Sequence, residues 1–123
     1  MCGITGVYNF NGSPVPVELI KKMNACIKHR GPDSSGYYSR GHVALGNRRL
    51  SILDLSSLGT QPMSDDENKV ALTYNGEIYN FRLLQKELRQ LGYGFNGHSD
   101  TEILLAAIEC WGIDKALKRF FGM

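Results

Sequence analysis

The sequence predicts a small mixed α+β domain, in which layers of sheet and helix enclose one core. Short apolar runs that end in turn formers indicate strands, and segments with helical periodicity and capping signals lie between and after them. The chain has 123 residues and no internal repeat. This length suits a single domain with a core of its own.

The first part of the chain predicts a strand, a helix and a hairpin. Residues 4–10 are an apolar run that ends in the turn-forming sequence Asn-Gly-Ser-Pro. Residues 17–29 place apolar side chains at helical spacing, and the Gly-Pro pair at 31–32 stops this helix. Two further strands are expected at 37–39 and 42–48, on either side of an Arg-Gly break.

The middle of the chain alternates between apolar and polar segments. A short apolar run at 50–55 is followed by a polar surface loop over 56–68, and residues 69–74 are the most strand-like run after it. The pair Asn75-Gly76 then makes a sharp break. Asn-Gly after a strand is a strong turn signal by itself, so these two residues alone leave a purely structural turn open.

The last part of the chain predicts three helices. Asn80 is expected to cap a helix over 81–91 that closes at a glycine. Ser99 and Glu102 have the spacing of a capping box, which predicts a second helix from this point. Residues 113–121 are expected to form a last short helix.

Composition argues against several classes of protein. The chain has 14 basic and 12 acidic residues, a net charge of +2, and its basic cluster at 28–30 is too short for a nucleic-acid binder. No apolar run approaches the roughly 18 residues that span a bilayer. The N-terminus has no charged region followed by a long apolar one, so it is not a signal peptide. We therefore expect a cytoplasmic protein that binds neither nucleic acid nor membrane.

The three cysteines form no CxxC pair and have no histidine at metal-ligand spacing, so no metal site is expected. Cys26 and Cys110 lie in predicted helices and are expected to be small, buried hydrophobic side chains. Cys2 differs in its position, directly after an initiator methionine that is usually removed before a small residue. By itself, this position leaves an incidental cysteine as the simpler interpretation.

Removal of Met1 would place a thiol and a free α-amine on the same residue, Cys2. The unperturbed pKa of such an amine is about 7.7–8.0, so a useful fraction is an unprotonated base at neutral pH. A nucleophile paired with the N-terminal amine is a recognised scheme that needs no histidine. We therefore expect no catalytic role for His29, His42 or His98, and we place His29 in a structural loop.

Five short motifs occur in order along the chain: MCGITGV at 1–7, KHRGPD at 28–33, NRRLSILD at 47–54, YNGEIYN at 74–80 and SDTE at 99–102. Together they resemble the N-terminal-nucleophile (class II) glutamine amidotransferase domain of glutamine-hydrolysing asparagine synthetases. The resemblance covers the whole chain. Residues 49–54 resemble the asparagine synthetase form, whereas the sugar-phosphate aminotransferring and purine-pathway relatives carry a different stretch there.

The resemblance assigns the chemistry to a small set of residues. Cys2 is the nucleophile that attacks the glutamine carboxamide. The side chain of Asn75 and the backbone N–H of Gly76 are the two donors to the oxyanion that forms, and each such donor lowers the barrier by roughly 3 kcal/mol.

The resemblance also assigns the residues that bind glutamine. Arg49 holds the carboxylate, for which a guanidinium fork is well suited. Asp100 holds the α-ammonium group, although an acid at this position also suits a helix N-terminus. Glu77 completes the contacts of the pocket. Backbone groups line the carboxylate side, from Leu50, Ser51, Ile52 and Leu53.

For the whole domain, the resemblance implies an N-terminal-nucleophile fold, a four-layer α/β/β/α sandwich of antiparallel sheets. Because the chain stops in the apolar sequence Phe-Phe-Gly-Met, we expect residues 1–123 to be a truncated amidotransferase type-2 domain that is incomplete at its C-terminus. In the resembled enzymes, ammonia passes through a tunnel to a C-terminal domain that uses ATP and Mg²⁺ to convert aspartate to asparagine.

The expected partners are L-glutamine and that synthetase domain, with no cofactor in the amidotransferase domain itself. The resemblance is also compatible with a homodimer. Two alternatives stay open: an amidotransferase of a cell-surface sugar or peptide modification pathway, and a non-catalytic regulatory domain with the same fold.

Overall fold

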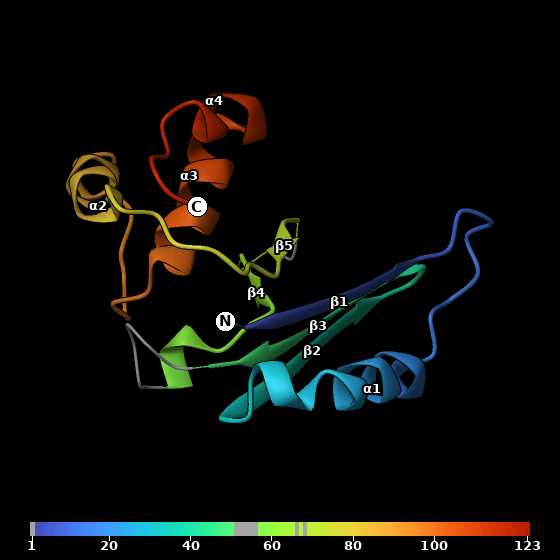
Figure 1. Ribbon diagram of the computed structural model, residues 1–123. Coiled ribbons are helices and arrows are strands. Elements are labelled where there is room, and N and C mark those ends of the chain that lie inside the picture. The colour runs from blue at the N-terminus through green and yellow to red at the C-terminus, as the bar shows by residue number, and fades with distance from the viewer. Residues whose placement is uncertain (1, 51–56, 66, 68) are drawn as a thin grey trace. The chain divides into compact units, whose positions relative to one another are not determined.

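The computed structural model describes residues 2–50, 57–65, 67 and 69–123. The chain divides into two compact units (Figure 1). The first unit contains Met1–Ile52, Thr60–Pro62 and Leu72–Asn75. The second contains Leu53–Gly59, Met63–Ala71 and Gly76–Met123. Strands dominate the first unit and helices the second, which gives the mixed α+β composition that the sequence predicts.

The first unit is built on a three-stranded antiparallel sheet with the order β1-β3-β2. The strands are β1 (Gly3–Tyr8), β2 (Ser34–Arg40) and β3 (Val43–Arg49). Gly41 makes the turn between β2 and β3 with a φ of 55°, a conformation that glycine adopts without strain. Pairing of Gly3 with Arg48 brings the start of β1 to the end of β3.

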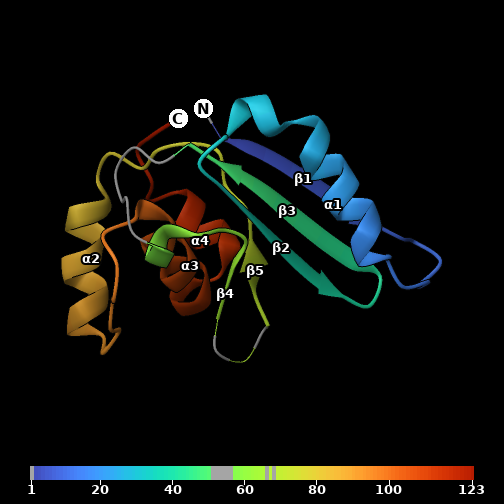
Figure 2. The same ribbon diagram turned by 90° about the horizontal axis from the view of Figure 1, so that it is seen from below.

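One face of this sheet is covered by α1 (Val17–Cys26), which is followed by the 3₁₀ helix η1 (Lys28–Arg30) (Figure 2). The core between helix and sheet consists of Val15, Ile20 and Ala44, all buried, with Val7 and Met23 packed against them. The side chains of β3 therefore alternate between this core and the opposite face of the sheet.

The second unit contains the remaining helices, α2 (Phe81–Gln90), α3 (Asp100–Trp111) and α4 (Ile113–Leu117), and the 3₁₀ helix η2 (Ser57–Gly59). Helix α3 is its most buried element, because both of its flanks pack against helices α2 and α4. Leu88 of α2, Ile103 of α3 and Ala116 of α4 are fully buried. Two short strands, β4 (Met63–Ser64) and β5 (Ala71–Leu72), form a separate two-stranded sheet.

The segment 119–123 runs antiparallel to residues 77–79 through a bridge between Ile78 and Gly122. The N–H of Tyr79 donates to the carbonyl of Phe121 at 2.7 Å, and the N–H of Glu77 donates to the carbonyl of Met123 at 2.9 Å. The backbone that follows Gly76 is therefore held by a ladder of hydrogen bonds.

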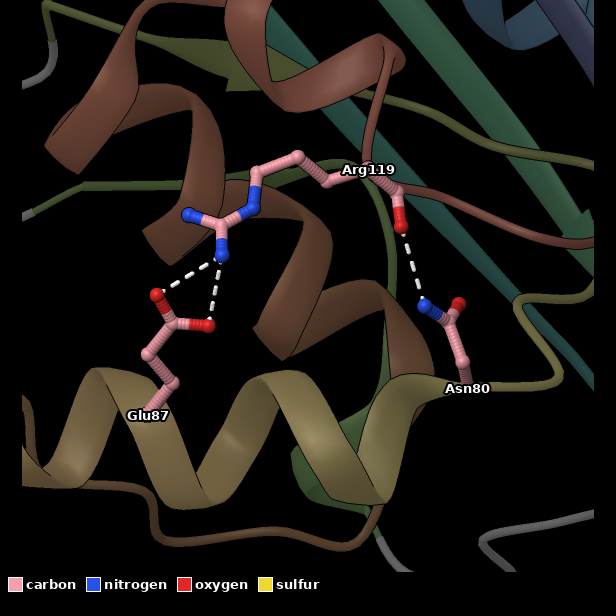
Figure 3. Close-up of polar contacts among 3 residues, drawn as sticks. All are labelled: Asn80, Glu87 and Arg119. Atoms are coloured by element: carbon pink, nitrogen blue, oxygen red, sulfur yellow. Dashed lines mark hydrogen bonds and ion pairs between the residues drawn. The ribbon is translucent and has the colours of Figure 1, made fainter.

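Arg119 anchors the start of this segment (Figure 3). One of its terminal nitrogens donates to both carboxylate oxygens of Glu87 at 2.7 Å, and its guanidinium carbon lies 3.9 Å from the centroid of the Trp111 ring. The side chain of Asn80 donates to the Arg119 carbonyl and accepts from the N–H of Phe121, both at 2.9 Å. The ion pair and the two amide hydrogen bonds fix the segment to α2.

The observed elements correct several details predicted from the sequence. The strand-like run at 69–74 is a strand only at β5, and the polar loop at 56–68 contains η2 and β4. The last helix ends at Leu117 rather than at residue 121, and most of the run at 50–55 lies outside the described residues. Within the part of the chain that the structure describes, no helix has both the length and the apolarity to cross a membrane.

Candidate functional site

Cys2 lies directly before β1, and its thiol contacts the residue that follows β3. Its Sγ accepts a hydrogen bond from the N–H of Leu50 at 3.3 Å and lies 3.6 Å from the Leu50 carbonyl. The side chain is half-buried. Because β1 and β3 are paired up to Gly3 and Arg48, the sheet brings these two strand ends together across a large separation in sequence. The structure therefore places the predicted nucleophile beside a predicted substrate-binding residue.

Arg49 ends β3 and is buried, with 8% of its surface exposed. Its carbonyl accepts a hydrogen bond from the N–H of Asp33 at 3.1 Å. At Gly31, an added Cβ would lie 2.1 Å from the carbonyl oxygen of Arg48 and 2.6 Å from the N–H nitrogen of Arg49. The predicted carboxylate-binding residue is thus fixed by a loop whose glycine allows direct contact between backbones.

Asn75 belongs to the same unit as Cys2, Arg49 and Leu50. The two residues before it are held by side chains. The N–H of Tyr74 donates to Oε1 of Gln61 at 2.6 Å, and the hydroxyl of Thr73 accepts from Nδ2 of Asn47 at 3.0 Å.

Gly76, Glu77 and Asp100 belong to the second unit. Asp100 is the first residue of α3 and has 6% of its surface exposed. Its Oδ2 accepts a hydrogen bond from the N–H of Ile78 at 2.8 Å, which ties the start of α3 to the segment that follows Gly76. The remaining predicted site residues, Ser51, Ile52 and Leu53, lie outside the described residues.

The capping predictions at the two helix starts are confirmed in part. Ser99 caps α3, because its hydroxyl accepts from the N–H of Thr101 at 3.1 Å. Glu102 does not complete a capping box; its carboxylate accepts from the N–H groups of Asn96 and Gly97 instead. Asn80 precedes α2 but makes no side-chain cap, because its amide binds the 119–123 segment described above.

None of the contacts described above involves a histidine, Cys26 or Cys110. His29 is in η1 and exposed, His98 is exposed, and the ring of His42 stacks edge-on against Tyr8 at 5.0 Å. The predicted burial of Cys26 is wrong: it is the last residue of α1 and exposed to solvent. Among the described residues, no three His, Cys, Asp or Glu side chains are grouped so that they could hold a metal ion.

Two residues in these contacts, Asn47 and Gln61, were not among the predicted site residues. Asn47 lies on β3, and the alternation of side chains along a strand predicts only which face of the sheet it lies on. Gln61 lies in the segment that the sequence predicts to be a surface loop, yet only 7% of its surface is exposed. The only local signal for Gln61 is the proline that follows it.

Residues 1–123 of the chain match the family model of the glutamine amidotransferase domain. The chain belongs to the glutamine amidotransferase family. This membership confirms the class II amidotransferase domain expected from the five motifs. The amidotransferase family implies that glutamine is the substrate of the domain.

Several curated proteins are similar to this amidotransferase domain. Asparagine synthetase [glutamine-hydrolyzing] 1 of Bacillus subtilis (strain 168) is 46% identical over 121 residues, which cover 96% of the domain and 19% of that protein. Asparagine synthetase B [glutamine-hydrolyzing] of Escherichia coli (strain K12) is 39% identical, over 86% of the domain and 19% of the relative.

A third relative, Amidase chry2 of Gibberella zeae, is named as an amidase rather than a synthetase. It is 36% identical over 125 residues, which cover 92% of the amidotransferase domain and 18% of the relative. The chain therefore spans about a fifth of the length of each of these three proteins.

Proposed function

We propose that this domain hydrolyses glutamine to glutamate and ammonia through a thioester on Cys2. The observation that carries the proposal is the position of the Cys2 thiol, held by the backbone of Leu50 at the end of β3 in a domain of the glutamine amidotransferase family. A cysteine in this position has a fixed sulfur and, once Met1 is removed, a base on its own backbone.

The reaction begins with transfer of the thiol proton to the α-amine of Cys2, directly or through a water molecule. The sulfur attacks the carboxamide carbon, and the carbonyl oxygen becomes an oxyanion that accepts hydrogen bonds from the Asn75 side chain and the Gly76 N–H. The protonated amine gives its proton to the leaving nitrogen, so that ammonia departs and a γ-glutamyl thioester forms. Water then attacks the thioester, releases glutamate and restores the thiol.

Recognition of glutamine is shared between charged side chains. Arg49 binds the carboxylate and Asp100 the α-ammonium group, with Glu77 and the backbone of residues 50–53 completing the pocket. The burial of Arg49 and Asp100 supports this assignment, since charge-assisted hydrogen bonds are stronger where water is excluded.

We further propose that the domain is the glutaminase part of a longer asparagine synthetase-like enzyme. The names of two relatives support this, and the short span of the chain relative to them agrees with it. In that enzyme the domain adopts the α/β/β/α sandwich, and a C-terminal domain uses ATP and Mg²⁺ to amidate aspartate with the ammonia released here. No cofactor acts in the glutaminase part, and the enzyme is cytoplasmic.

A second candidate acceptor is a sugar or peptide rather than aspartate. The similarity to a protein named an amidase favours this candidate, because that relative is similar to the domain but is not named a synthetase. The residues assigned above act on glutamine in either case. A non-catalytic regulatory role is disfavoured because Cys2, Arg49, Asn75, Gly76 and Asp100 are all present.

The mechanism is tested by intact-mass analysis with 6-diazo-5-oxo-L-norleucine, a glutamine analogue that alkylates such thiols. We expect the full-length protein that carries this chain to have lost Met1 and to gain one adduct, located at Cys2 by peptide mapping. The variant Cys2→Ala should gain none, while Cys26→Ala should still gain one. A protein that keeps Met1 and gains no adduct would contradict the mechanism.

A further inference from the structure

Asn47 lies at the centre of a row of residues that crosses the sheet of the first unit. It pairs with Ile4 of β1 on one side and with Gly36 of β2 on the other. Its backbone carbonyl accepts from Nδ2 of Asn24 at 3.2 Å, so α1 fixes this row from its own side of the sheet. Asn47 is almost completely buried, with 1% of its surface exposed.

The side chain of Asn47 fixes the segment that leads to Asn75. Its Nδ2 donates to the hydroxyl of Thr73 at 3.0 Å and to Oε1 of Gln61 at 3.4 Å. The same Oε1 accepts the N–H of Tyr74 at 2.6 Å. Two buried amide side chains therefore hold both residues that precede Asn75.

Gln61 is itself held against the sheet by its backbone. A Cβ built on Gly36 would lie 1.9 Å from the Gln61 carbonyl oxygen, so the chain at residue 61 lies directly on β2 where a side chain would otherwise stand. This contact leaves Gln61 little freedom to move away from Asn47 and Tyr74.

Stability alone does not account for these polar groups. A buried amide loses its hydrogen bonds to water, and Oδ1 of Asn47 has no hydrogen-bond partner among the described residues. An apolar side chain of similar volume would avoid this loss. What the amides provide is direction, because each hydrogen bond restricts where Thr73 and Tyr74 can lie.

We propose that Asn47 and Gln61 are positioning residues for glutamine hydrolysis, which set the place of the oxyanion donor Asn75 relative to Cys2. The inference rests on the proposed function. Ile4, in the same row as Asn47, is two residues from Cys2, and Tyr74 is the neighbour of Asn75. The network thus joins the backbone next to the nucleophile to the backbone next to the donor within one unit.

This arrangement predicts an effect on turnover rather than on glutamine binding. A donor that is aimed at the transition state acts only when its position is correct, and a displacement of about 1 Å can lower a rate on the order of 10²-fold. Arg49 and Asp100, proposed to bind the two ends of glutamine, are not among the partners described above for Asn47 and Gln61. We therefore expect kcat to fall while KM stays nearly constant.

The test compares Gln61→Met, which removes the acceptor for Tyr74, with Gln90→Met on the exposed end of α2. In the full-length protein, Gln61→Met should lower the kcat for glutamine hydrolysis roughly 10–100-fold, with KM within about 3-fold of the unmodified protein. Gln90→Met should leave both constants unchanged. A folded Gln61→Met protein with normal kcat would overturn the proposal.

A second pair of variants keeps the test decisive if Gln61→Met folds poorly. Thr73→Val removes the hydroxyl that Asn47 binds and keeps the shape, whereas Thr73→Ser keeps the hydroxyl. We expect a lower kcat in Thr73→Val and recovery in Thr73→Ser; equal kcat in both folded proteins would overturn the proposal. Labelling of Cys2 by 6-diazo-5-oxo-L-norleucine distinguishes failure of this inference from failure of the proposed function. An unlabelled Cys2 in the unmodified protein would contradict the proposed function itself.

Discussion

Gly31 lies where two stretches of backbone meet without room for a side chain. A Cβ there would overlap the carbonyl of Arg48, and a backbone atom, unlike the end of a flexible side chain, cannot move away cheaply. The contact secures the end of β3, where Arg49 and Leu50 follow one another beside Cys2. Glycine is needed at this position for space rather than for an unusual backbone angle.

Replacing this residue, Gly31→Ala, should lower the free energy of unfolding by about 1–3 kcal/mol, the usual effect of overpacking. Gly94→Ala is the matched control, because no heavy atom of the described residues beyond its two chain neighbours lies within 4 Å of a Cβ at Gly94; its effect should stay within about 0.5 kcal/mol. Thermal unfolding of the full-length protein, followed by near-UV circular dichroism, measures both. Equal stability of the two variants would contradict the contact.

At the scale of single residues, the sequence predicts which residues take part in the proposed reaction but not the residues that hold them in place. Cys2 stands out because of its place after Met1, and Arg49 and Asn75 because they lie in motifs. Asn47 lies in the motif at 47–54 and Gln61 in none, but the resemblance assigns a role to neither. Their partners are distant in sequence, and a polar residue in a strand or loop is ordinarily solvated. Only the fold shows that both amides are buried.

Among the helices, α2 has the clearest division between a buried and an exposed side. Leu84 and Leu88 are one helical turn apart and buried, with 3% and 0% of their surface exposed, whereas Leu83 is 67% exposed. This division follows from apolar residues at helical spacing in the sequence, which is why the helix could be predicted.

Truncation of the buried leucine, Leu88→Ala, should cost about 2–5 kcal/mol of stability, because it removes contacts and leaves a cavity. Leu83→Ala changes the same atoms on the exposed side and should cost less than about 0.5 kcal/mol. Urea unfolding of the full-length protein compares the two. Losses of equal size would mean that α2 does not pack on this side.

Where the predicted elements differ from the structure, the residues concerned bind partners that are distant in sequence. Residues 69–74 have the composition of a strand, yet Thr73 and Tyr74 bind the amides of Asn47 and Gln61 instead of a neighbouring strand. Asn80 has the position of a cap, yet its amide binds the 119–123 segment. Which partners these residues bind depends on groups that are distant in sequence, and the periodicity of the local sequence does not predict those partners.

At the scale of the whole molecule, large side chains are exposed on the hydrogen-bonded ladder that residues 77–79 form with residues 119–123. Tyr79, Phe121 and Met123 are 61%, 71% and 68% exposed, and all three lie in the ladder that continues from Gly76. In the longer enzyme proposed above, further layers of the sandwich would cover such side chains.

We therefore expect the 123-residue chain, produced alone, to hydrolyse glutamine weakly or not at all, and the longer protein to do so fully. A coupled assay of glutamate release at equal protein concentration measures the difference, with Cys2→Ala of the longer protein as the blank. A monomeric 123-residue chain with full turnover would contradict this expectation.

The pairing of β1 with β3 begins at Gly3, one residue after Cys2. A purification tag fused ahead of Cys2 would leave this pairing intact and the thiol beside Leu50, but it would turn the amine into an amide. Under the mechanism proposed above, such a preparation would be folded but unable to hydrolyse glutamine, and this inactivity would resemble that of a non-catalytic domain. A tag at the other end of the longer protein leaves the amine free.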